Sequence, residues 1–146
     1  MPLYIFNQVI FTTKQIFMAF KTKLKVGGNE YNVLSCSYAL KQETDATGRP
    51  SSVTRGGEIK VTIESTGGTE LFEWQCSSFE RRDGSIEFTK RDTDAKLKEV
   101  NFEEGYLTFY KEDFDASGTN PLTQTFTISA KKLSSGGGIH ENEWPV

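Results

Sequence analysis

The sequence contains few of the residues that most often carry chemistry in proteins. Its 146 residues include one histidine, His140, and two cysteines, Cys36 and Cys76, which lie far apart and form no CxxC motif. We interpret the cysteines as reduced, partly buried thiols of a chain that folds in the cytosol. Their spacing alone does not decide between this interpretation and a disulfide.

His140 is a poor candidate for catalysis or metal binding. It lies in a tail that Gly136–Gly138 would loosen, whereas catalysis requires a preorganised nucleophile, base and orienting group. Glu141 and Glu143 lie nearby, but a flexible tail with one histidine provides weak ligand spacing. We therefore predict no catalytic residue, no metal and no cofactor, and we interpret the tail as a docking segment anchored by Trp144.

Paired carboxylates and paired glycines do not change this prediction. The carboxylate pairs are Glu103-Glu104, Glu112-Asp113 and Asp92/Asp94, and the glycine pairs lie at 27–28, 56–57 and 67–68. No carboxylate lies in an apolar run that would raise the pKa of one member of a pair, as a glycosidase acid requires. No glycine pair belongs to a GxxxxGK[ST] or GxGxxG motif, so no phosphate-binding loop is indicated.

The charge balance and the absence of long apolar runs exclude other classes. With 17 basic and 20 acidic residues the net charge is −3, which gives no general attraction for nucleic acid or anionic lipid. Lys21, Lys23 and Lys25 form a basic stripe, but no aromatic residue interleaves it, so stacking on bases is unsupported. We interpret the stripe as a solvent-facing or subunit-facing side of a strand, and we predict no membrane insertion.

Eleven Phe, five Tyr and two Trp residues favour β structure, and the apolar positions alternate as strands require. Residues 20–26 and 59–63 alternate in this way, and residues 122–132 give the cleanest pattern. The turn chemistry and spacing predict a mostly β fold, a compact antiparallel β-barrel of about seven strands with one short flanking α-helix.

The helix is expected directly after Thr69, which can cap it, with Arg81 and Arg82 near its end. Its buried stripe would contain Leu71, Phe72, Cys76 and Phe79, with Trp74 at the edge.

Two domain segments are expected. Residues 1–17 are apolar but interrupted, and they lack the basic region and cleavage site of a signal peptide. We interpret residues 1–17 as an N-terminal extension outside the core domain and residues 18–146 as the barrel domain.

Polar loop and strand surfaces are the main positive features. A charged loop over residues 43–55 contains Asp45, Arg49, Pro50 and Arg55. The predicted strand surfaces are Thr123, Thr125, Thr127, Ser129 and Lys131 in one row, and Glu58, Lys60, Thr62 and Glu64 in the other. Either the exposed sheet of a monomer or the wall of a water-filled channel would show such faces, and the pattern leaves both open.

From Met18 onward the chain resembles the Hcp family, the tube protein of type VI secretion, and in particular its Bacteroidales branch, called TssD. The resemblance is carried by MAFKTKLKVGGNEYNVLSCSYAL, DATGRPSSVTRGGEIKVTIEST, LFEW, GSIEFTKRDTDAKLKEVNFEEGYL, FTISAKK and HENEWP. It implies a structural protein without an active site, whose hexameric rings stack into a tube that sheath contraction propels and that carries effectors.

The resemblance also implies partners and places. The chain would assemble with itself and with the sheath, spike and baseplate proteins, in the cytoplasm, and would then be secreted to the extracellular space or a target cell. The loop with Asp45, Arg49, Pro50 and Arg55 would stack rings, and the Thr123–Lys131 row would face the lumen or a subunit. The alternatives are a phage or other contractile-injection tail-tube protein and a monomeric small-ligand-binding β-barrel, with a small hydrolase third.

Overall fold

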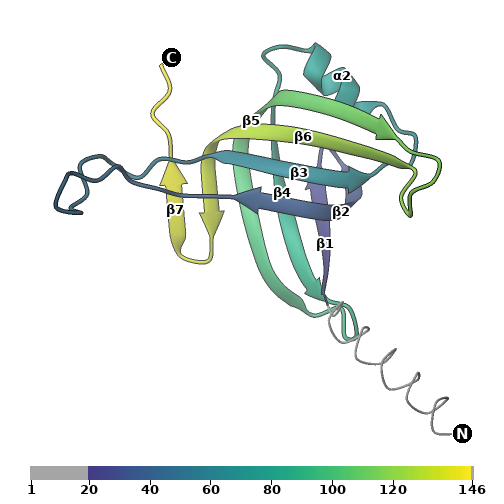
Figure 1. Ribbon diagram of the computed structural model, residues 1–146, viewed down its shortest axis with the longest axis horizontal. Helices are drawn as coiled ribbons and strands as arrows, with labels where there is room; N and C mark the ends of the chain where they lie inside the picture. Colours follow the sequence, from purple (N-terminus) through teal and green to yellow (C-terminus); the bar gives the residue numbers. More distant parts are fainter. Residues whose placement is uncertain (1–19, 146) are drawn as a thin grey trace, which may run out of the picture.

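Six antiparallel strands close into a barrel, and a seventh strand extends it at one end (Figure 1). The computed structural model describes residues 20–145, and the prediction for residues 1–17 lies outside this range. The strands are β1 (Phe20–Val26), β2 (Asn29–Tyr38), β3 (Glu58–Glu64), β4 (Arg81–Lys90), β5 (Lys96–Phe114), β6 (Leu122–Ser135) and β7 (Gly138–Glu141), and the helix is α2 (Glu70–Cys76). The neighbour order is β3-β2-β1-β4-β5-β6-β7, and β6 also pairs with β3, which closes the barrel. The predicted mostly β barrel with one short helix is confirmed.

Strict alternation along β3 and β6 builds the core. Phe126, Ile128 and Ala130 of β6 are fully buried, and Ile59 and Ile63 of β3 join them from the paired strand. Each fully buried aliphatic or aromatic side chain of this kind contributes roughly 1.5–3 kcal/mol to folding. The barrel interior is therefore a packed core.

Gly84 lies inside β4, three residues after the strand begins at Arg81. The pairing register with β5 shifts between Arg82 and Gly84, as a β-bulge requires. A Cβ atom on Gly84 would lie 2.5 Å from Cζ of Phe102. A glycine at this position therefore lets the buried Phe102 ring pack against the backbone of β4.

The predicted helix is present and Leu71 is buried as expected, but Phe72, Cys76 and Phe79 of the expected stripe are exposed. Leu71 and Trp74, three positions apart, are the buried residues of α2, and the Trp74 Nε1–H donates to the Glu80 carbonyl at 2.9 Å. Phe72 and Phe79 are 56% and 86% exposed. The helix ends at Cys76, so Phe79 does not lie on its buried face.

Arg81 and Arg82 begin β4 instead of ending the helix, and α2 has no basic residue in its last turn.

The C-terminal segment is ordered, which corrects the expectation of a tail freed by glycines. Gly136 and Gly137 form the turn of a hairpin in which β7 pairs with the end of β6, and His140 lies opposite Leu133. Gly136 has φ +58°, the left-handed conformation that glycine adopts without strain. Among the described residues, no helix is long and apolar enough to cross a membrane.

Candidate functional site

Residues 41–55 form an exposed hairpin, called the arm here, that projects from the barrel between β2 and β3 (Figure 1). Backbone bridges join its two sides at Lys41/Arg55 and at Thr44/Pro50. The Lys41 N–H donates to the Arg55 carbonyl at 3.0 Å, and the Arg55 N–H donates back at 2.7 Å. All residues from 41 to 51 are exposed, so the arm is held by its own hydrogen bonds and not by packing on the barrel.

Asp45 organises the tip of the arm. Its Oδ1 accepts hydrogen bonds from the Thr47 hydroxyl at 2.7 Å, the Thr47 N–H at 2.8 Å and the Arg49 N–H at 3.2 Å. The Thr47 side-chain and backbone bonds hold the pKa of Asp45 below its usual value, because they favour the ionised carboxylate. This is the hydrogen-bonded turn that Asp favours, and it orders the tip without any contact to the barrel.

The three remaining predicted loop residues also lie on the arm, fully accessible to a partner. Arg55 Nε lies 3.5 Å from Glu43 Oε1 across the hairpin, and Pro50 pairs with Thr44. Arg49 is exposed and forms no ion pair with any described residue. The structure brings all four residues together, and their role in ring stacking stays a prediction.

Asn142 ties the base of the arm to the barrel, a role that the sequence analysis did not predict. Its Nδ2 donates to the carbonyl of Gly56 at 2.9 Å and to that of Ala130 at 3.3 Å. The Ala130 N–H in turn donates to the Gly57 carbonyl at 2.8 Å. The segment after β7 therefore fixes the base of the arm, where the chain enters β3, against β6. The Gly56-Gly57 pair was the only signal: a Cβ on Gly57 would lie 2.5 Å from Asn142 Nδ2.

The two polar rows predicted separately form one continuous surface, called the threonine face here. Its residues are Thr123, Thr125, Thr127, Ser129 and Lys131 of β6 and Glu58, Lys60, Thr62 and Glu64 of β3. Antiparallel pairing sets Thr62 opposite Thr125, with their Oγ1 atoms 3.1 Å apart, and Lys60 opposite Thr127. Phe109 of β5, 49% exposed, lies opposite Thr127 on the other side of β6.

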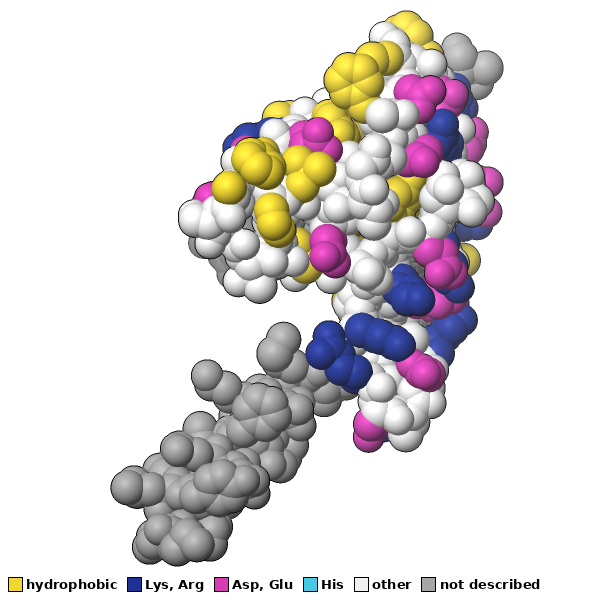
Figure 2. Space-filling model, turned by 90° about the vertical axis from the view of Figure 1, so that its right-hand side faces the viewer, with side chains coloured by type: hydrophobic (Ala, Val, Ile, Leu, Met, Phe, Trp, Pro, Cys, Tyr) yellow, Lys and Arg dark blue, Asp and Glu magenta, His cyan; other side chains and the backbone are white. Residues whose placement is uncertain are grey.

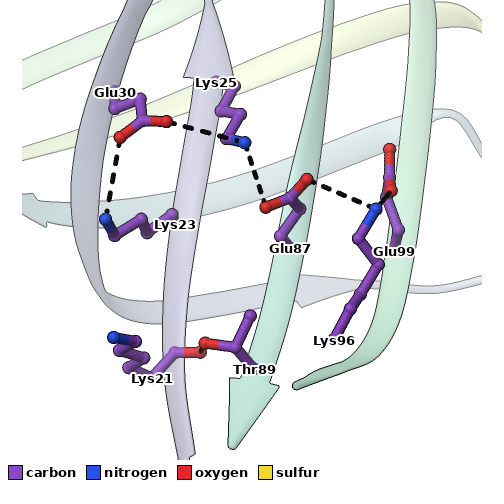
Figure 3. Close-up of polar contacts among 8 residues, drawn as sticks. All are labelled: Lys21, Lys23, Lys25, Glu30, Glu87, Thr89, Lys96 and Glu99. Atoms are coloured by element: carbon purple, nitrogen blue, oxygen red, sulfur yellow. Dashed lines mark hydrogen bonds and ion pairs between the residues drawn. The ribbon is translucent and has the colours of Figure 1, made fainter. Parts of the chain in front are cut away.

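A second outer face, over β1, β4 and β5, carries the lysine stripe, and its charges are paired (Figure 3). Lys25 Nζ lies 3.1 Å from Glu87 Oε2 and 3.5 Å from Glu30 Oε1, and Lys23 also contacts Glu30. Lys96 contacts Glu87 and Glu99. The hydrogen bond from Lys25 is the main cause that holds the pKa of Glu87 below its ordinary value. With its lysines neutralised in this way, the face offers little attraction for phosphates.

Trp144 lies against the barrel on the aromatic ring of Tyr106, with ring centroids 5.3 Å apart. Tyr106 is held by Arg81, whose Nε donates to the Tyr106 hydroxyl at 2.7 Å and whose guanidinium lies 5.3 Å from the ring centroid. The indole is half-buried. The function of Trp144 as a docking anchor stays a prediction.

The candidate chemical residues are dispersed. His140 lies in β7, 3.1 Å from the Asn142 side chain, and no described residues form a cluster of three or more metal-ligating groups. Both cysteines are free. Cys36 is half-buried, and burial raises its pKa to about 11, whereas Cys76 is exposed instead of partly buried as expected.

The chain has close counterparts among known proteins. Residues 18–145 match the family model described as Hemolysin coregulated protein Hcp (TssD). The structure of Hcp1 from Flavobacterium johnsoniae is 59% identical, with 84% of this chain and 99% of that chain covered and a TM-score of 0.81. No match was found among curated proteins.

More distant solved structures share the fold alone. Hcp1 from Salmonella typhimurium is 16% identical, covering 84% of this chain and 91% of that chain, with a TM-score of 0.67. The sheath-tube complex of the PVC extracellular contractile injection system gives 23% identity, 80% and 88% coverage and a TM-score of 0.52.

Proposed function

The chain belongs to the Hcp (TssD) family, and from this we propose that six copies close into a ring and that such rings stack into the inner tube of a type VI secretion machine. The observation that carries the proposal is the family match over residues 18–145, together with 59% identity to Hcp1 of F. johnsoniae over nearly the whole of that protein. The work of such a subunit is to fit against copies of itself.

The arm supports a contact between rings. It is ordered, polar and exposed over residues 41–51, so its side chains are free to contact a second ring. We propose that Asp45 sets the shape of the tip, that Arg49 and Arg55 supply its charges, and that Pro50 stiffens its return strand. Exposed ion pairs contribute only about 0–1 kcal/mol each, so contacts of this type hold a stack that still comes apart after ejection.

The threonine face supports a lumen wall. Side chains such as Thr62, Thr125 and Thr127 are short and uncharged, and Thr62 and Thr125 contact one another across the strands, so they offer little to which a passing protein would adhere. We assign this face, and the row Thr123–Lys131 in particular, to the lumen, and the paired charges around Glu87 to another side of the subunit.

The other partners that we propose are proteins of the secretion machine. We propose that the assembled tube lies in the cytoplasm inside a contractile sheath, contacts the spike and baseplate, and is then secreted with effectors in or on it. Its contribution is mechanical, and no step of it requires a catalytic group.

The monomeric ligand-binding barrel is a weaker candidate because the barrel interior is filled. Trp74, Phe102 and Phe126 are each less than 2% exposed and occupy the space that a ligand would need. The tail-tube alternative shares the architecture, and the likeness to the contractile injection system supports the fold only.

The stacking role of the arm is tested by the double variant Arg49→Ala, Arg55→Ala. It is expected to keep its fold and its rings but to lose stacks of rings in electron micrographs, because the charges at the contact are gone. The matched control is Lys90→Ala, Arg91→Ala, which removes two exposed basic groups at the turn after β4. Stacks of unchanged length in the arm variant would refute the assignment of the arm, while rings in both proteins would leave the tube proposal standing.

A further inference from the structure

The two ends of the barrel are closed in different ways. At one end α2 covers the opening, and its Leu71 and Trp74 are buried in the core. Phe72 and Phe79 point outward from this cap, 56% and 86% exposed, and the Phe72 ring contacts Tyr110 edge-on at 5.9 Å between centroids. We call α2 with its Phe72, together with Phe79 three residues after the helix ends, the cap. Two exposed phenylalanines near a buried tryptophan lower the solubility of the isolated chain and do not add to the stability of its fold.

Figure 2 looks onto the side of the molecule that lies at the right in Figure 1. It shows hydrophobic side chains gathered in its upper half and lysine and arginine side chains in its lower half. On this face the exposed apolar groups are therefore concentrated in the upper half.

At the other end of the barrel, beside β7, the interior opens into a groove of about 320 Å³. Tyr38, Leu40, Val100, Leu133 and Ile139 give it an apolar lining, and His140, Thr54 and two serines border it as well. Leu40 and Ile139 form its rim and are 55% and 66% exposed, while Val100 and Leu133 belong to the core. The groove is therefore a place where a neighbouring apolar side chain can reach the core of this barrel.

The charges beside the two ends are complementary. Glu70 and Glu73 belong to the cap, and Lys41 and Lys98 lie next to the groove, Lys41 directly after Leu40 and Lys98 with its Nζ 5.9 Å from the Tyr38 ring centroid. None of these four residues takes part in an ion pair within residues 20–145. An acidic apolar cap and a basic apolar groove on one chain fit one another better than either fits itself.

We propose that the cap of one copy docks into the groove of the next copy, with Phe79 as the central side chain. The inference rests on the proposed function and names the surfaces that would close the ring. Because α2 and β7 lie at opposite sides of the barrel (Figure 1), the contact is heterologous, and each copy offers one cap and one groove. Such a head-to-tail contact closes into a ring when the rotation per subunit divides a full turn. Only the base of the arm borders this contact, through Lys41 and Thr54, and the tip of the arm around Asp45 stays available for the neighbouring ring.

The first test is Phe79→Ser, with Phe109→Ser as the matched control. Phe109 is a half-exposed phenylalanine on the threonine face, away from the cap and the groove. Removal of a central aromatic anchor is expected to raise the concentration at which rings dissociate by at least about tenfold, while the control leaves it unchanged. Native mass spectrometry over a dilution series measures this, and circular dichroism checks the fold. Equal dissociation of the two variants would overturn the proposal.

The second test joins the two surfaces covalently. In a protein carrying Cys36→Ser and Cys76→Ser, the pair Phe79→Cys with Ile139→Cys is expected to form intermolecular disulfides under mild oxidation, giving a ladder of covalent oligomers that ends at the ring. Each single-cysteine protein is expected to give no ladder. Rings without any ladder would overturn the cap-and-groove contact alone. A wild-type protein that forms no rings at any concentration would contradict the proposed function as well.

Discussion

At the residue scale, the exposure of an aromatic side chain distinguishes residues that stabilise the fold from residues that are available for assembly. Trp74 is 1% exposed and donates its indole N–H to the Glu80 carbonyl, and its ring lies under the Arg82 guanidinium at 5.0 Å. Phe79, five residues later, is 86% exposed. The first side chain stabilises the monomer, and the second is available only to another molecule.

Sequence reasoning assigned these aromatic residues the wrong way round for a physical reason. Helical periodicity places Leu71 with either Trp74 or Phe72, depending on which face meets the barrel, and only the packing against β5 decides between them. Phe79 was counted as helical because nothing in its neighbourhood marks the end of the helix at Cys76. Hydrophobicity alone does not distinguish a side chain buried in the core from one reserved for an interface.

Gly84 gives the sharpest prediction at this scale. Gly84→Ala places a Cβ 2.5 Å from both the Phe102 ring and the Lys25 carbonyl oxygen, inside the core and between paired strands. We expect the free energy of unfolding to fall by about 1–3 kcal/mol, the usual cost of overpacking. Chemical denaturation measures it, with Gly137→Ala as the control, because nothing lies within 4 Å of a Cβ there and a change within about 0.5 kcal/mol is expected. If the two variants unfold at the same denaturant concentration, the packing account of β4 is wrong.

At the element scale, local patterns predicted the strands well and their ends less well. Alternation in residues 122–132 placed Phe126, Ile128 and Ala130 in the core correctly, because one face of β6 is fully buried and period two is then strict. The hairpin of β6 and β7 was missed, because three consecutive glycines signal a flexible segment as readily as a turn. Leu133 pairs with His140 only because β6 offers its edge to β7, and a local sequence pattern carries no information about this pairing.

The arm shows the same division. Asp45 and Gly48 are residue types that favour a turn, since Asp accepts backbone hydrogen bonds and glycine adopts the positive φ of +91° found there. The contact of Asn142 with Gly56, by contrast, joins residues 86 positions apart and leaves no trace in local composition.

Asn142→Ala tests whether this contact holds the arm in place. The variant loses the hydrogen bonds to the Gly56 and Ala130 carbonyls, so the base of the arm is expected to open more often. We expect faster amide hydrogen exchange at Lys41 and Arg55, with strands β3 and β6 unchanged. Asn101→Ala, which removes an exposed amide that bonds to no described residue, is the control and should leave exchange in the arm unaltered. Arm protection equal to that of the wild type would show that the arm orders itself without Asn142.

At the scale of the whole molecule, each outer region of the barrel has a different character. The arm is polar and projects, and the threonine face combines hydroxyl side chains with two lysines and two glutamates. The face around Glu87 carries paired charges, and the two ends are apolar with opposite charges that form no ion pair within residues 20–145. A monomer needs no such division. A subunit that contacts neighbours in its own ring and in the next ring, and that also lines a channel, needs a separate surface for each of these roles.

Electron microscopy of the purified wild-type protein tests the central claim most directly, through two-dimensional class averages of single particles. The account predicts annular particles with sixfold symmetry and an open centre, some of them stacked. Uniform small particles of the mass of one chain at every concentration, with a small molecule held in an apolar hollow, would contradict it.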